Sequence, residues 1–140
     1  ASRYDLVVLD TPPSLDIISV GALVAATHVL VPVQLESPAL DGLERALVTI
    51  EEIRQTLNPA LQYLGAVGVM FDQRTRVHTQ TREELAGWPE ALMLETLIHR
   101  NTRLVESITV LEPINHYDAT ARGAREYEAL AAELEELIDG

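Results

Sequence analysis

The apolar residues of this chain fall into short, dense runs that polar segments separate. Three runs have the length and the Val and Leu content of strands covered on both faces: residues 4–10 (YDLVVLD), 28–33 (HVLVPV) and 63–72 (YLGAVGVMFD). A weaker run at residues 91–98 predicts a fourth strand. The glycines at positions 65 and 68 indicate that a neighbouring element approaches the third run closely.

Between these runs the apolar spacing changes to three and four residues, which is typical of helices. The clearest stripe is Leu40, Leu43, Leu47, Ile50, Ile53 and Leu57. Ser37-Pro38 opens this helix, and Asn58-Pro59 ends it. The other predicted helices run from a Ser14 cap to about residue 26, over 79–86, briefly after an Asn101 cap, and from about 120 to 138.

Strands that alternate with helices predict an α/β fold, with a mostly parallel sheet flanked by helices. The length of 140 residues fits one domain, 1–140. In such sheets ligands bind at the carboxyl ends of the strands. Asp10, Asp72 and His99–Asn101 all stand at predicted strand ends. We therefore expect the functional site at that edge.

The composition removes several kinds of chemistry. The chain has no cysteine, which excludes disulfides, thiolate metal sites and cysteine nucleophiles. All ten basic residues are arginine, so a lysine Schiff base and a lysine-bearing P-loop are excluded within this chain. No apolar run approaches the ~20 residues of a membrane span, and no signal peptide is evident. We expect a soluble, cytoplasmic protein.

Asp10 has three interpretations at the end of its apolar run. It can hold a hydrated Mg²⁺ beside nucleotide phosphates, as a Walker B acid does. It can be an ordinary capping or turn aspartate. A phosphoacceptor needs a downstream lysine and a preceding acidic pair, which this chain lacks. Thr11 and the rigid Pro12-Pro13 suit a nucleotide-sensing switch, although a plain loop would look similar.

The basic residues are distributed unevenly. Half of them lie between Gln73 and Arg103, namely Arg74, Arg76, Arg82, Arg100 and Arg103. That segment carries a charge of about +1, while the chain as a whole carries −12. It fits a phosphate-binding face on an acidic protein and equally a solvated surface of mixed charge. No aromatic ladder accompanies the arginines, which argues against stacking on single strands.

The four histidines, at positions 28, 78, 99 and 116, show no metal-binding spacing. We interpret them as structural or incidental, with His99 kept in view because it neighbours the expected site.

Five phrases carry a resemblance to a known family. They are YDLVVLDTPPS, ALVAATHVLVPVQLE, LNPALQYLGAVGVMFDQRT, IHRNTRLVES and PINHYDATARGAREYEALAAEL. In order and spacing they resemble the ParA/Soj branch of the ParA–MinD ATPases, P-loop proteins that segregate chromosomes and plasmids. The resemblance covers almost the whole chain and implies the carboxyl-terminal portion of a ParA-type ATPase domain, from the Walker B strand onward.

The resemblance also implies roles for single residues. Asp10 matches the Walker B acid, which reaches Mg²⁺ through water, and Thr11 lies in the adjoining switch. Arg100 and Asn101 match the loop beside the adenine. Arg74 and Arg103 match the arginines that contact DNA without sequence preference. His99 is a departure, because the family usually has proline there.

In this family the Walker A loop, with its two lysines, and the switch I aspartate belong upstream of Tyr4. We therefore expect this chain alone to have no ATPase activity. The complete protein is expected to use ATP and Mg²⁺, to form a homodimer on non-specific DNA, and to be stimulated by a centromere-binding ParB-type partner. The resemblance places such a protein in the cytoplasm, on the nucleoid.

Two alternatives remain. One is a non-catalytic α/β module that acts through protein–protein contacts. The other is a MinD-like ATPase that cycles on a membrane. The last helix has an acidic polar side, whereas membrane-surface helices need a basic one, so the sequence disfavours that alternative.

Overall fold

The fold is known from a computed structural model that describes residues 3–14, 16–36 and 38–140. Three parallel strands form one sheet in the order β1-β2-β3: β1 (His28–Gln34), β2 (Gln62–Phe71) and β3 (Met93–His99). The helices are α1 (Ile17–Ala25), α2 (Ala39–Thr56), α3 (Arg76–Ala86), α4 (Thr102–Thr109), α5 (Ile114–Tyr117) and α6 (Arg122–Asp139), with a 3₁₀ turn η1 (Pro89–Ala91). The predicted α/β class with a parallel sheet is confirmed.

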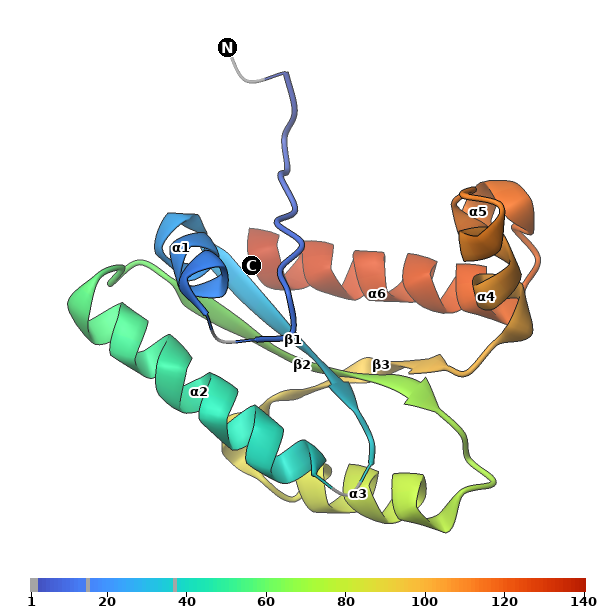
Figure 1. The fold of residues 1–140 in the computed structure, drawn as a ribbon, viewed down its shortest axis with the longest axis horizontal. Coiled ribbons are helices and arrows are strands. Elements are labelled where there is room, and N and C mark those ends of the chain that lie inside the picture. Colours follow the sequence, from blue (N-terminus) through green and yellow to red (C-terminus); the bar gives the residue numbers. More distant parts are fainter. Residues whose placement is uncertain (1–2, 15, 37) are drawn as a thin grey trace.

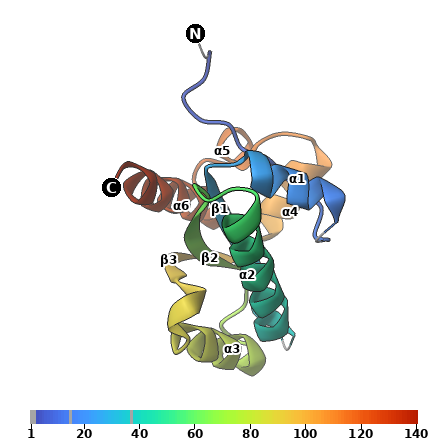
Figure 2. The same cartoon turned by 90° about the vertical axis from the view of Figure 1, so that its left-hand side faces the viewer.

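Helices cover both faces of the sheet. In Figures 1 and 2, α6 lies on one face and α2 and α3 lie on the other. The core on the α2 and α3 side includes Val33, Leu43, Ala66, Phe71 and Leu85. The core on the α6 side includes Val67, Leu94, Ile98 and Leu130. A third cluster packs α1 against α2 beside β1 and includes Ile50, Ile53 and Leu61. The buried faces therefore follow the apolar stripes of the sequence.

The predicted strand at residues 4–10 is wrong. This segment forms no strand and runs away from the sheet (Figure 1). The side chains of Leu6 to Leu9 are 51–81% exposed. A strand exists only when a neighbour satisfies its backbone groups, and in the described residues β1, β2 and β3 pair only with one another. An apolar segment with the sequence of a buried strand is thus exposed to solvent.

The start of α1 also differs from the prediction. Asp16, and not Ser14, caps the helix, because its carboxylate accepts from the backbone N–H groups of Ile18 and Ser19. The Ser14 hydroxyl instead donates to Asp16 at 2.7 Å. Ser and Asp are equally good caps, so the sequence did not discriminate between them. Ser37, predicted to open the next helix, lies outside the described residues.

Several other predictions are confirmed. The strands at 28–33 and 63–72 appear as β1 and β2, and Asn101 caps α4. The close approach at the glycines is present as well. Gly65 has a φ of +134°, and a Cβ there would collide with the carbonyl oxygen of Leu92. At Gly68 a Cβ would lie 2.7 Å from Cδ2 of Leu97. Both glycines therefore allow β3, and Leu92 just before it, to pack tightly against β2.

Candidate functional site

Two of the predicted polar stretches meet at the carboxyl ends of β2 and β3. Phe71 is the register partner of His99, and the backbone N–H of Arg100 donates to the carbonyl of Phe71 at 3.0 Å. Asp72 and Arg100 therefore leave adjacent strands at the same edge of the sheet. This confirms the expected gathering for Asp72 and His99–Asn101, whereas Asp10, the third member of that prediction, ends no strand.

The turn after β2 is organised by Asp72. Its Oδ1 accepts from the backbone N–H of Arg74 at 3.0 Å and from Nε of that residue at 3.1 Å. Its Oδ2 accepts a hydrogen bond from Nη2 of Arg74 at 3.1 Å. These hydrogen bonds from Arg74, with smaller help from the charge of Arg100, hold the pKa of Asp72 at about 2. The Arg74 side chain remains 87% exposed, so the predicted DNA contact lies open to solvent.

His78 holds the same turn from α3. Its Nδ1 accepts from the backbone N–H of Asp72 at 3.0 Å, and the residue is 6% exposed. Because Nδ1 accepts, the neutral ring carries its proton on Nε2, which lies 4.0 Å from a carboxylate oxygen of Glu36. No pattern in the sequence connects His78 with the site. Its role in the turn depends on α3 folding back onto β2, which no local pattern reveals.

The turn after β3 leads directly into α4. Oδ1 of Asn101 accepts from the backbone N–H of Arg103 at 2.8 Å, so the side-chain amide of this residue keeps its two donors. Arg100 is exposed. Arg103 lies 2.8 Å from a carboxylate oxygen of Glu106 and 3.4 Å from one of Asp118. The hydrogen bond from Arg103 lowers the pKa of Glu106.

A largely buried carboxylate of α6 reaches the end of β3. Oε2 of Glu126 accepts from the backbone N–H of His99 at 2.7 Å, and Oε1 lies 2.7 Å from Nδ1 of the His99 ring. Nε of Arg122 donates to Oε1 at 2.6 Å. The His99 ring also lies edge-on to the ring of Phe71, with 5.0 Å between the centroids.

Glu126 was not among the predicted site residues, although the sequence carries a signal for it. Glu126 and Glu133 stand four and three residues from the buried Leu130 and therefore share its side of the helix. Acids on the apolar stripe of a helix indicate a partner in the core.

Asp10 and Thr11 lie in the exposed segment before α1. Within the described residues their side chains form no hydrogen bond or ion pair, and nothing joins them to Arg100 or Asn101. The described part of the chain also holds no group of three or more side chains suited to binding a metal ion. A single carboxylate such as Asp10 still fits Mg²⁺, which keeps several waters and takes its other ligands from phosphates.

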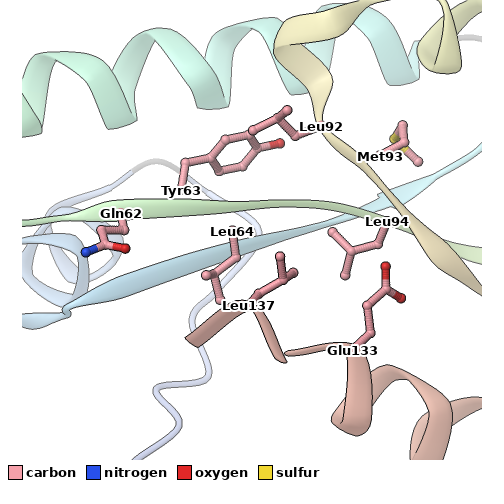
Figure 3. A pocket seen from close by; sticks show the side chains of 8 residues that line it. All are labelled: Gln62, Tyr63, Leu64, Leu92, Met93, Leu94, Glu133 and Leu137. Carbon is pink, nitrogen blue, oxygen red and sulfur yellow. The ribbon is translucent and has the colours of Figure 1, made fainter. Parts of the chain in front are cut away.

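A shallow cavity of about 350 Å³ lies at the other end of the sheet (Figure 3). Residues at the starts of β2 and β3 line it together with Glu133 and Leu137 of α6. At its rim the hydroxyl of Tyr63 donates to the carbonyl of Ala91 at 2.8 Å, and burial raises the pKa of Tyr63 to about 12. This cavity is separate from the edge where Asp72 and Arg100 meet.

Comparison with known proteins shows a likeness to partition proteins. Residues 1–63 match the AAA domain family. The chain is 40% identical over 134 residues to the chromosome partitioning protein ParA of Myxococcus xanthus, covering 96% of this chain and 47% of that protein. It is 42% identical over 131 residues to the chromosome-partitioning ATPase Soj of Thermus thermophilus, covering 94% and 53%. Over almost its whole length the chain is similar to ParA and Soj partition proteins.

The chain spans about half the length of the curated relatives it matches. Its fold is similar to half of a solved nucleotide-bound protein, cobyrinic acid a,c-diamide synthase from Mycobacterium smegmatis with bound ADP and magnesium. The TM-score is 0.73 at 29% identity, over 94% of this chain and 46% of that one. The fold is therefore that of part of a P-loop NTPase. None of the described helices is both long and apolar enough to cross a membrane.

Proposed function

We propose that this chain is the carboxyl-terminal portion of a ParA-type partition ATPase, from the Walker B segment around Asp10 onward. One observation carries the proposal: the likeness to ParA and Soj covers 94–96% of the chain but only about half of each relative. On this proposal, residues 1–140 form part of a larger ATPase domain in which a lysine-bearing phosphate loop comes from the rest of the protein.

Asp10 and the end of β3 have complementary roles in this proposal. Mg²⁺ would neutralise charge on the nucleotide phosphates. The carboxylate of Asp10 orients a water of the ion, and Thr11 lies in the adjoining switch. Arg100 and Asn101 offer donors to the nucleotide base, and the side-chain amide of Asn101 suits this role because only its oxygen is used in capping α4.

The proposed partners are a second copy of the protein, non-specific DNA and a ParB-type centromere-binding protein, on the nucleoid in the cytoplasm. Arg74 and Arg103 are proposed to contact phosphates, and both are exposed. Each already faces carboxylates of its own chain, so a DNA phosphate must compete with Asp72 for Arg74 and with Glu106 for Arg103.

The test is Mg²⁺-dependent ATP hydrolysis by the full-length protein. Replacing Asp10→Ala should lower turnover at least about 100-fold, the scale of losing one group that organises transition-state charge. The fold should persist, because the Asp10 side chain has no hydrogen-bond partner among the described residues. Asp5→Ala, in the same exposed segment, is the matched control and should keep normal turnover. Normal turnover in Asp10→Ala would contradict the Walker B role.

A second candidate is a non-catalytic module for protein–protein contact. The observation in its favour is an apolar stripe on α4 and just after it, where Val105, Ile108 and Leu111 are exposed. The same assay separates the two candidates, because a full-length wild-type protein without ATPase activity would support the module.

A further inference from the structure

The backbone that carries Arg100 and Asn101 is fixed at three points. The N–H of Arg100 donates to the carbonyl of Phe71 in β2, and the side chain of Asn101 caps α4. The third contact comes from α6, where Glu126 accepts from the N–H of His99. Of the three contacts, only this one comes from a side chain of an element distant in the sequence.

We propose that Glu126 is a positioning residue that holds the 99–101 loop in the geometry needed for the nucleotide base. This inference rests on the proposed function, in which Arg100 and Asn101 face the base. Glu126 acts through the backbone and need not touch the nucleotide itself.

The contacts of Glu126 suit this role. The carboxylate is 16% exposed and the His99 side chain is 14% exposed, so both groups lie largely out of water. One oxygen binds the backbone N–H of His99, while the other meets the His99 ring and Nε of Arg122. Nδ1 of the His99 ring is buried and forms no aligned hydrogen bond with any described residue, and Oε1 of Glu126 lies 2.7 Å from it. Removing Glu126 would strip the N–H and the ring of His99 of their partner at once.

The backbone N–H of His99 explains why such a residue is useful here. Proline fixes φ and has no N–H, so a loop with proline needs no acceptor at this point. Histidine leaves φ unrestrained and adds a backbone N–H that needs an acceptor. In this chain Glu126 satisfies that donor and restrains the backbone through a charge-assisted hydrogen bond.

Glu133 provides a matched control on the same helix. Its two oxygens accept from the backbone N–H groups of Glu95 at 2.7 Å and Thr96 at 3.0 Å. Both carboxylates thus bind backbone N–H groups of β3, but Glu133 binds four and three residues before the 99–101 loop. A purely structural role for these acids predicts that Glu126 and Glu133 behave alike.

The experiment measures the affinity of the full-length protein for Mg²⁺–ADP and for inorganic tripolyphosphate, which lacks the base. Glu126→Ala should weaken ADP binding about tenfold, the scale of one charge-assisted hydrogen bond, and leave tripolyphosphate binding unchanged. Glu133→Ala should lower the melting temperature and leave both affinities unchanged. Glu126→Gln keeps an acceptor for His99 and should bind ADP within about threefold of wild type.

The decisive control is the same substitution in a His99→Pro background. Because proline has no N–H, Glu126→Ala should then have no further effect on ADP affinity. Equal ADP affinities in wild type and Glu126→Ala, or equal losses in Glu126→Ala and Glu133→Ala, would overturn the positioning role alone. If the wild-type protein binds no ADP, the proposed function fails first and takes this inference with it.

Discussion

Asp72 shows how single residues organise the candidate site. Its carboxylate takes two hydrogen bonds from the Arg74 side chain and one from the Arg74 backbone, while its own N–H donates to the buried His78. Asp72 thus holds the turn after β2 through both its side chain and its backbone N–H. The Arg74 guanidinium is placed in the solvent by a local interaction that does not depend on any ligand.

The ionisation of Asp72 gives a direct test of this arrangement. The depressed pKa means that the pair stabilises the folded chain above the usual pKa of 3.8, and that this contribution is lost as the pH falls from there to about 2. Arg74→Ala should bring the pKa of Asp72 back towards 3.8, measured from the carboxyl carbon in an NMR titration. Arg76→Ala, at the start of α3, should leave it near 2. A value that stays near 2 in Arg74→Ala would show that the cause is misassigned.

At the residue scale, the sequence predicted the positions of polar groups better than their partners. Asp72 and His99–Asn101 were expected at one edge because strand ends can be recognised locally. The roles of His78 and Glu126 were missed, since each depends on a contact with an element 6 or 27 residues away. Such contacts are set by how helices pack on the sheet and leave only a weak periodic signal.

At the element scale, Asn58 ends two helices. Its backbone N–H donates to the carbonyl of Ile53 at the end of α2. Its side-chain nitrogen donates to the carbonyls of Leu23 at 2.9 Å and Ala26 at 2.8 Å, which are among the last carbonyls of α1. A residue expected only to stop one helix therefore also caps the helix packed beside it.

Replacing Asn58→Ala should consequently lower the free energy of unfolding by about 1–3 kcal/mol, because two partly buried carbonyls lose their donor. Denaturation with urea, followed by circular dichroism, measures this loss. Asn115→Ala provides the comparison: Asn115 is exposed on α5, and its change should stay within about 0.5 kcal/mol. Equal small effects for both variants would mean that the cap contributes nothing to stability.

The sequence predicted most elements because their signals are local. The stripe of α2, the apolar runs of β1 and β2 and the Asn101 cap all appear where expected. The segment 4–10 has an equally clear pattern and still forms no strand. Its pattern describes what the segment would bury, whereas a strand also needs a neighbour to pair with. The four-residue α5 was missed because so short a helix has no measurable period.

At the scale of the whole molecule, the proposed contact with DNA must be reconciled with a net charge of −12. Repulsion dominates on average, so binding requires arginines gathered on a local face. The five arginines of the 73–103 segment are exposed, and Arg103 is fixed in place by Glu106 and Asp118. That fixation positions the guanidinium but offsets part of its charge.

Arg103→Ala in the full-length protein should therefore weaken binding to all DNA sequences alike and reduce the slope of log affinity against log salt by about one. Titrations of unrelated duplexes at several salt concentrations measure both. Arg54 is the matched control, because it forms a similar i,i+3 pair with Glu51 at 2.9 Å on α2, outside the basic segment. Arg54→Ala should leave the slope unchanged. Glu106→Gln removes a carboxylate that competes for Arg103 and should strengthen binding at low salt. An unchanged slope in Arg103→Ala would mean that DNA, if bound, meets another face of the molecule.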